Sequence, residues 1–237
     1  MSNILVTGAS QGIGAEMVKL FAGDTNNRVV AISRNLQKLE ELKSFCKQEY
    51  KNDIQVFSID YLSSTFQNDF EAILLKCQFH FDIVINNAGF LLNKTFSEVL
   101  YDDLIKTYQV NLYAPIQIIQ SLLRNNIDKT KKTHVVNIGS MGGYQGSVKF
   151  PGLSIYSSSK AALANLTECL AEEYKDTKVK FNCLALGAVQ TEMLSKAFPD
   201  YEAQTSAQEM AAYIVEFTQT GDQYFNGKVI PVSKQTP

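Results

Sequence analysis

The chain has 237 residues, of which 45% are hydrophobic and 19% charged, and its formal net charge at pH 7 is −2. This length and composition fit one globular domain with a sizeable core better than two smaller domains. The lack of a basic excess argues against nucleic acid or a membrane as a partner, and no apolar run reaches the roughly 18 residues of a transmembrane helix.

Short apolar segments rich in β-branched residues alternate with helical patterns along almost the whole chain. Such alternation predicts an α/β fold, in which a doubly wound parallel sheet of about seven strands carries helices on both faces. We expect a single domain of the Rossmann type over residues 1–237. Strands are predicted at 4–6, 28–33, 54–58, 82–86, 134–138, 179–184 and 228–232, and helices at 12–21, 36–49, 65–77, 101–125 and 156–173.

The first strand leads into a glycine-rich turn, Thr7-Gly8-Ala9-Ser10-Gln11-Gly12-Ile13-Gly14, which opens the first helix. Gly8 permits a tight turn, Gly12 lets backbone amides approach a pyrophosphate, and Gly14 lets the helix pack closely on the strand. The helix N-terminus adds free N–H groups and a positive dipole end. The placement predicts a dinucleotide site, although a glycine turn can also be purely structural. The predicted contacts are Gly8, Ser10, Gln11, Gly12, Ile13 and Gly14.

The second strand ends in Ser33 and Arg34, where a site for NAD usually carries an acidic residue that binds the ribose 2′-hydroxyl. A guanidinium can instead bind a 2′-phosphate through two hydrogen bonds. This pair therefore predicts NADP(H) as the preferred cofactor, with NAD(H) possible. The alternative is that Arg34 is a solvated surface residue.

An acid/base pair is predicted on the helix after the fifth strand, where Tyr156 and Lys160 lie one turn apart on the same face. A nearby ammonium is expected to lower the tyrosine pKa from its usual value near 10, which would allow proton exchange with a carbonyl oxygen. Ser140, at the end of the fifth strand, could hydrogen-bond the same oxygen. Taken alone, each of these residues also has an ordinary structural explanation.

With Asn86-Asn87-Ala88-Gly89 and Asn111 between them, these motifs resemble the short-chain dehydrogenase/reductase family over about residues 3–232. The resemblance implies that Asn111, Ser140, Tyr156 and Lys160 are catalytic, with Asn111 holding a water in a proton relay that reaches Lys160. Lys160 would also bind the nicotinamide ribose. The remaining implied cofactor contacts are Asp60 at the adenine, Asn87, Ala88 and Gly89 along the cofactor, and Val189 and Thr191 at the nicotinamide carboxamide.

Three positions depart from the family pattern. Gln11 stands where many NADP-preferring relatives carry a basic residue, and Leu186 stands where the family usually has proline. Ser140 and Tyr156 are separated by fifteen residues, which is more than the family commonly has. A longer loop is expected to absorb the excess through Gly142, Gly143, Gly146, Pro151 and Gly152.

Apolar residues near these motifs predict a pocket for a moderately hydrophobic carbonyl, although some could equally be core or interface residues. The expected activity is NADPH-dependent reduction of a ketone or aldehyde with Tyr156 as proton donor. The alternatives are an NAD-dependent alcohol dehydrogenase and a catalytically silent dinucleotide-binding regulator. The candidate substrate-pocket residues are Phe90, Leu91, Leu92, Met141, Tyr144, Phe150, Met193, Leu194 and Phe198.

The resemblance also implies a homodimer or homotetramer that pairs through the helices at 101–125 and 155–174. Small and apolar residues cover more than one face of the second helix, as a close partner helix would require. They are Ala161, Ala162, Leu163, Ala164, Leu166, Leu170 and Ala171.

The cysteines are widely spaced and form no Cys-x-x-Cys pair, so no metal site is expected. Reduced, buried thiols in a cytoplasmic protein are the simplest interpretation of this pattern. A first strand that begins at Asn3 or Ile4 is expected to leave no room for a signal peptide before it. The four cysteines are Cys46, Cys77, Cys169 and Cys183.

Overall fold

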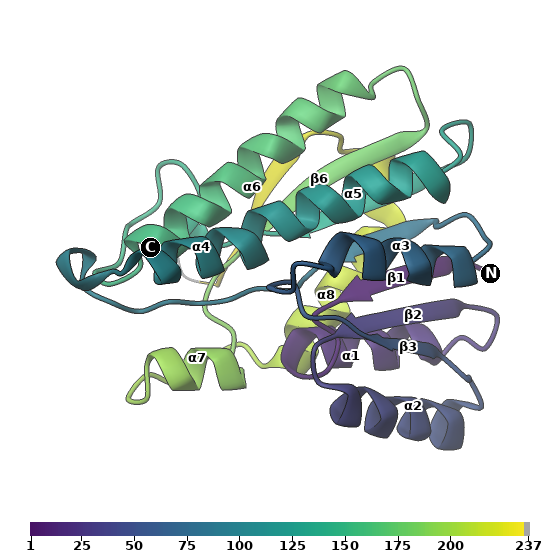
Figure 1. Ribbon diagram of the computed structural model, residues 1–237, viewed down its shortest axis with the longest axis horizontal. Coiled ribbons are helices and arrows are strands. Elements are labelled where there is room, and N and C mark those ends of the chain that lie inside the picture. Colours follow the sequence, from purple (N-terminus) through teal and green to yellow (C-terminus); the bar gives the residue numbers. More distant parts are fainter. Residues whose placement is uncertain (235–237) are drawn as a thin grey trace.

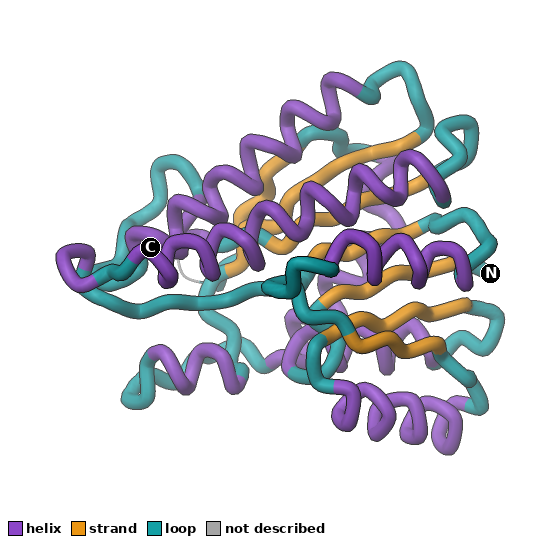
Figure 2. The backbone as a smooth tube through the Cα atoms, in the orientation of Figure 1, coloured by secondary structure: helices purple, strands orange, loops and turns teal. Residues whose placement is uncertain are grey.

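A seven-stranded parallel sheet forms the middle layer of the protein, and helices cover both of its faces (Figures 1 and 2). The computed structural model describes residues 1–234. The strands run in the order β3-β2-β1-β4-β5-β6-β7, which confirms the predicted doubly wound α/β fold. Their bounds are β1 Asn3–Thr7, β2 Arg28–Ser33, β3 Gln55–Ser58, β4 Ile83–Asn86, β5 Thr133–Ile138, β6 Val179–Leu186 and β7 Lys228–Val232.

The helices divide into two groups, one on each face of the sheet (Figure 1). Helices α1 (Gly12–Ala22), α2 (Leu36–Tyr50) and α8 (Ala207–Thr220) share one apolar core with the sheet. The other core includes side chains of α3 (Phe66–Lys76) and α5 (Ala114–Asn125), together with the C-terminal part of α6 (Ser154–Glu173). Shorter elements lie between strands and helices: α4 Tyr101–Tyr108, α7 Glu192–Ala197 and 3-10 turns at Phe96–Glu98, Met141–Gly143 and Gly221–Gln223.

The central strands are apolar throughout because each of their faces meets one of these two cores. On β1, Ile4 and Val6 belong to the core with α1, whereas Leu5 between them belongs to the core with α3. Leu5 also pairs with Val30 on one side and Val84 on the other, so β1 lies at the centre of the sheet. The strand order reverses between β1 and β4, and open sheets of this kind bind ligands beyond such a point, at the carboxyl ends of the strands.

The helix predicted at 101–125 is interrupted by a π-helical segment, Gln109–Tyr113, between α4 and α5. There the amide of Ala114 donates to the carbonyl of Gln109, five residues earlier. Pro115 contributes to the interruption because it has no N–H with which to continue the regular ladder. As a result Asn111 is fully buried and points inward rather than lying on an exposed helix surface.

One strand is longer than predicted, whereas the loop before Tyr156 is long, as expected. Strand β6 continues to Leu186, which pairs with Val232, and the amide of Gly187 donates to the Val232 carbonyl over 2.9 Å. The residues between Ser140 and Tyr156 form a 3-10 turn and a longer loop, in which Gly146 and Gly152 adopt positive φ. Within residues 1–234, no helix combines the length and the apolar character needed to cross a membrane.

Helix α1 begins unusually close to β1. A Cβ atom added at Gly14 would overlap the carbonyl oxygen of Gly8 and would lie 2.7 Å from Asn87 Nδ2. Gly8 has a φ of 65°, a conformation that favours glycine. The glycines therefore permit the close helix–strand packing that the sequence predicted for Gly14.

We expect Gly14→Ala to lower the free energy of unfolding by about 1–3 kcal/mol, because the backbone of α1 must move away from β1 to admit the methyl group. Urea denaturation measures this change. Gly23→Ala at the end of α1 is the control, since its added Cβ would come no closer than 3.2 Å to a neighbouring atom outside the adjacent residues. An unchanged midpoint for Gly14→Ala would contradict the packing argument.

Candidate active site

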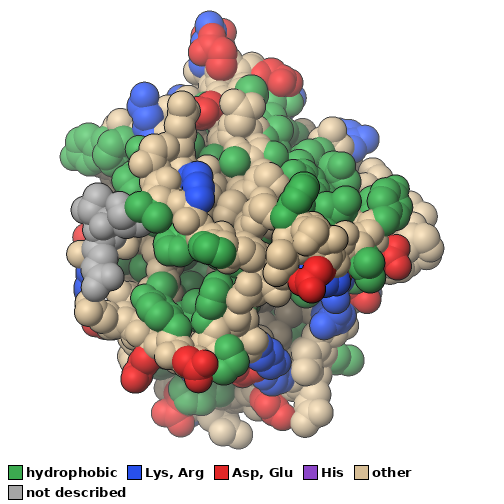
Figure 3. All heavy atoms as spheres, turned by 90° about the vertical axis from the view of Figure 1, so that its left-hand side faces the viewer, with side chains coloured by type: hydrophobic (Ala, Val, Ile, Leu, Met, Phe, Trp, Pro, Cys, Tyr) green, Lys and Arg blue, Asp and Glu red, His purple; other side chains and the backbone are tan. Residues whose placement is uncertain are grey.

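A large cavity of about 1120 Å³ lies at the carboxyl ends of the strands. Hydrophobic side chains gather around a hollow on this face of the molecule (Figure 3). Every predicted catalytic or cofactor-binding residue lines the cavity except Asn111, which is fully buried. The lining residues that were predicted are Gly8, Ser10, Gln11, Gly12, Ile13, Gly14, Ser33, Arg34, Asp60, Asn87, Ala88, Gly89, Ser140, Tyr156, Lys160, Val189 and Thr191.

One end of the cavity is shaped by the turn before α1. Gly12 has a φ of 54°, and a Cβ there would lie 3.4 Å from the Thr191 methyl group, so the glycine keeps the passage between the two segments open. Asn87 Nδ2 donates to the carbonyls of Thr7 and Gly8 over 3.0 and 3.2 Å, which fixes this turn to β4. A turn without side chains in front of a helix N-terminus fits the pyrophosphate of a dinucleotide.

Polar groups from β2 and α2 border the same end. Ser33 Oγ lies 2.8 Å from Ser10 Oγ, and the exposed Arg34 extends from the end of β2. Lys38, which was not predicted, donates from Nζ to Gln11 Oε1 over 2.9 Å and to Glu192 Oε1 over 3.1 Å. Cationic groups from two positions therefore reach the place where a ribose phosphate would lie.

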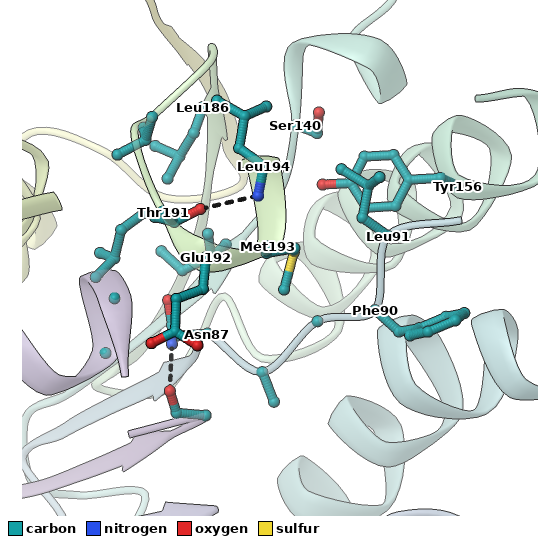
Figure 4. Close-up of a pocket in the computed structure, with 18 of the residues that line it drawn as sticks. Asn87, Phe90, Leu91, Ser140, Tyr156, Leu186, Thr191, Glu192, Met193 and Leu194 are labelled. Atoms are coloured by element: carbon teal, nitrogen blue, oxygen red, sulfur yellow. Dashed lines mark hydrogen bonds between the residues drawn. The ribbon is translucent and has the colours of Figure 1, made fainter. Parts of the chain in front are cut away.

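The implied adenine contact at Asp60 has a structural role as well. Its Oδ1 accepts a hydrogen bond of 3.0 Å from the amide of Leu62, which stabilises the turn after β3, and Asp60 also lines the cavity. Thr191 likewise begins α7 by accepting a 3.2 Å bond from the Leu194 amide (Figure 4). Both side chains are held at the cavity wall by hydrogen bonds from backbone amides two or three residues later in the chain.

The predicted acid/base group occupies the other end of the cavity. Figure 4 shows the Tyr156 hydroxyl pointing from α6 toward Ser140, despite the longer loop between them. Burial raises the pKa of Tyr156 above its usual value of 10.0, and the contact with Ser140 partly opposes this rise. The phenol is therefore held in its protonated form at neutral pH, which suits a proton donor.

Lys160 is almost fully buried, with 3% of its surface exposed, and its Nζ donates to the carbonyl of Ile138 over 2.7 Å. Burial lowers the pKa of Lys160 to about 8. The sequence argument expected the ammonium to lower the tyrosine pKa, and that expectation is wrong for this structure. Desolvation by burial is the largest cause of both shifts, because it disfavours the charged form of each group.

Asn111 connects the π-helical segment to both sides of the site. Its Oδ1 accepts from the Phe90 amide over 2.7 Å, and its Nδ2 donates to the Phe90 carbonyl and to Ser159 Oγ. A Cβ added at Gly89 would lie 3.7 Å from Asn111 Oδ1 and 3.6 Å from Lys160 Nζ. Asn111 and Lys160 therefore both lie next to Gly89.

Most of the predicted apolar residues line the substrate end, but Leu92 and Tyr144 do not. The structure adds residues that the sequence did not single out, because their helices and loops reach the cavity only in the folded chain. Among them is Lys106, whose Nζ lies 4.3 Å from the centre of the Phe90 ring. Within residues 1–234, no group of His, Cys, Asp or Glu side chains could hold a metal ion. The added apolar and aromatic residues are Val110, Val148, Leu153 and Tyr201.

Of the cavity residues that the sequence analysis did not single out, Lys38 is the one that a sequence signal could have revealed. A cation in the first turn of a helix faces the positive end of the helix dipole, and the first turn of α2 contains no acidic residue. That unfavourable placement, one turn after Arg34, was a signal of a nearby anion. Nothing in the local sequence pointed to Glu192 as the partner of Lys38, since the two residues are 154 positions apart in the chain.

Comparison with known proteins shows which family the chain resembles. A family model described as short chain dehydrogenase matches residues 2–202. The chain is 31% identical over 191 residues to carbonyl reductase [NADPH] 2 of the pig, covering 80% of this chain and 72% of that protein. A crystal structure from Shigella flexneri, complexed with NADP, is 26% identical with a TM-score of 0.87, covering 97% of this chain and 96% of that one.

The chain is also similar to the mouse dehydrogenase/reductase SDR family member 7B, with 29% identity over 193 residues. This match covers 80% of the chain but only 58% of the mouse protein, so the chain spans little more than half of that relative.

Proposed function

We propose that this chain, which belongs to the short-chain dehydrogenase/reductase family, is an oxidoreductase that uses NADP(H) to reduce a ketone or aldehyde to an alcohol. The observation that carries the proposal is the cavity itself. A pyrophosphate cradle at Gly12 and a protonated Tyr156 that faces Ser140 border the same space. A cofactor that extends from the first group to the second would meet a carbonyl held at the second.

The side chains have distinct roles in this proposal. Bound NADPH supplies the hydride that adds to the carbonyl carbon. Tyr156 donates its hydroxyl proton to the carbonyl oxygen, and Ser140 orients that oxygen by a hydrogen bond. Lys160 and Asn111, on either side of Gly89, hold a water through which the tyrosine recovers its proton.

Several features favour NADP(H) over NAD(H). Ser33 and Arg34 stand where an acidic residue would bind the 2′-hydroxyl of NAD, and the guanidinium of Arg34 can pair with a 2′-phosphate. The pig relative is an NADPH carbonyl reductase by name, and the Shigella structure contains NADP. Residues 8, 10–14, 33, 34, 60, 87–89, 156, 160, 189 and 191 are the cofactor contacts that we propose.

The substrate end favours a moderately hydrophobic carbonyl compound. Leu91, Met141 and Met193 line the cavity near Tyr156, and burial of apolar surface would contribute to substrate binding there. Helix α7 closes over this end, since Asn93 Nδ2 donates to the Ala197 carbonyl over 2.8 Å.

Tyr156→Phe removes the transferable proton but keeps the ring. We expect kcat for carbonyl reduction to fall by about 10²–10⁴-fold, which is the usual contribution of general acid catalysis. The dissociation constant for NADPH, measured by fluorescence titration, should change less than twofold. Tyr144→Phe is the matched control, because Tyr144 lies outside the cavity lining and should keep the parental rate. Turnover of Tyr156→Phe within a few-fold of the parent would exclude the proposed role.

The rate of reduction should depend on the charge of Lys160, whose pKa is about 8. Below that pH the ammonium is mostly protonated and can support the proton relay, whereas above it the charge is lost. The pKa of Tyr156 is raised, so the tyrosine remains a donor across this range. We therefore expect kcat/KM for reduction to be level near pH 7 and to fall as the pH rises through 8. A profile that stays level to pH 10 would contradict this assignment.

We also propose that the protein is a homodimer or homotetramer. Tyr101 on α4 is 73% exposed and Ile105, one turn later, is 45% exposed, so this helix presents an unpaired apolar stripe. On α6, Leu163, Ala164 and Ala171 are buried in the protein's own core, which leaves Ala161 and its neighbours available to a partner helix. A self-complementary surface of this kind is usually paired about a two-fold axis.

Light scattering at micromolar concentration should give at least twice the 26.4 kDa mass of one chain. Ile105→Asp should lower that mass because it places a charge in the proposed interface. Leu75→Asp is the control, since Leu75 is 74% exposed on α3, away from α4. A parental mass near that of one chain would exclude the proposal.

A further inference from the structure

An ion pair joins the two sides of the cavity at its cofactor end. Lys38 on α2 reaches Glu192, the first residue of α7, with Nζ 3.1 and 3.3 Å from its two carboxylate oxygens. The same ammonium donates to Gln11 Oε1 over 2.9 Å. All three residues line the cavity, together with Ser33 and Arg34.

The position of Lys38 favours an anionic partner. It is the third residue of α2, where the helix dipole is positive, and its own amide donates to the capping oxygen of Asn35. Gln11, which stands where many NADP-preferring relatives carry a basic residue, accepts a hydrogen bond from the ammonium of Lys38 through its side-chain oxygen. The second cation is therefore provided by α2 instead of the glycine turn.

Glu192 is a weaker partner for this cation than a phosphate would be. The Lys38 and Glu192 side chains are 36% and 51% exposed, and ion pairs at such positions contribute little net stability. A phosphate monoester carries about −1.5 to −2 charges and three acceptor oxygens, so it can bind Lys38 and Arg34 together. Once a phosphate binds there, repulsion between the two anions disfavours the carboxylate of Glu192.

We propose that Lys38 binds the 2′-phosphate of NADP(H) beside Arg34, and that Glu192 is an internal competitor which the phosphate displaces. NAD(H) has no 2′-phosphate and leaves the Lys38–Glu192 pair intact. The inference rests on the proposed use of NADP(H), and it adds two specificity-determining residues to that site.

The displacement would also act on α7. This helix is attached at its start by Glu192 to α2 and at its end by the Ala197 carbonyl to Asn93. Binding of the phosphate frees the first attachment and leaves the second in place. The start of the helix that covers the substrate end then responds to which cofactor is bound.

Equilibrium binding of two cofactor fragments tests the proposal without a substrate. Adenosine 2′,5′-bisphosphate and adenosine 5′-monophosphate differ only in the 2′-phosphate. We expect Lys38→Gln to weaken binding of the bisphosphate by about tenfold, as for loss of one charge-assisted hydrogen bond, and to leave the monophosphate within twofold. Lys47→Gln is the matched control, since Lys47 pairs with Asp53 at the far end of α2 and lies outside the cavity lining.

Glu192→Gln tests the competitor directly. It should strengthen binding of the bisphosphate by about two- to fivefold, because an exposed ion pair no longer has to be broken. The same change should have no effect when Lys38→Gln is already present. If Glu192→Gln binds the bisphosphate more weakly than the parent does, Glu192 is not a competitor. If Lys38→Gln loses affinity equally for the bisphosphate and the monophosphate, Lys38 does not bind the 2′-phosphate.

Arg34→Ala separates this inference from the proposed function. If the parent prefers the bisphosphate and Arg34→Ala loses that preference while Lys38→Gln keeps it, only the Lys38 inference fails. If the parent shows no preference for the bisphosphate, both the inference and the proposed use of NADP(H) fail.

Discussion

Helix α1 starts so close to β1 that no side chain fits between Gly14 and the carbonyl of Gly8, and the rest of the site is arranged around that approach. The contact fixes the helix N-terminus directly beyond the strand. Asn87 then ties the same turn to β4 by donating to the carbonyls of Thr7 and Gly8. Because β1 and β4 lie where the strand order reverses, this junction determines where a dinucleotide can enter and which strand ends face it.

The pKa values of Tyr156 and Lys160 are determined by burial more than by a direct charge interaction between the two groups. Lys160 is nearly sealed from solvent and is held by the carbonyl of Ile138, so its charged form is disfavoured although it is hydrogen-bonded. Tyr156 is kept protonated by the same low polarity. Burial thereby moves the two proton affinities apart: the lysine pKa falls to about 8, whereas the tyrosine pKa rises above 10.0. Such an arrangement favours a tyrosine that gives up its proton only when a neighbouring oxygen develops charge.

Helix α7 links the two ends of the cavity. Thr191 caps its first turn while bordering Gly12, Glu192 reaches Lys38, and Ala197 is bonded to Asn93 on the substrate side. A short helix attached at both ends to different elements can transmit the occupancy of one end to the shape of the other. The ion pair at its start is exposed, and such pairs contribute little net stability.

Local pattern in the sequence was enough to predict the sheet, the glycine turn and the placement of Tyr156 and Lys160 one turn apart on a helix, since strand period, turn chemistry and helical spacing are properties of neighbouring residues. It also predicted which residues would gather, because strand ends of a parallel sheet share one edge. Three features were decided only by tertiary structure. The π-helical segment turned Asn111 inward, desolvation reversed the expected pKa shift of Tyr156, and folding brought Lys38 to Glu192. Each depends on how deeply a group is buried or on contact between distant segments, and packing of the whole chain determines both.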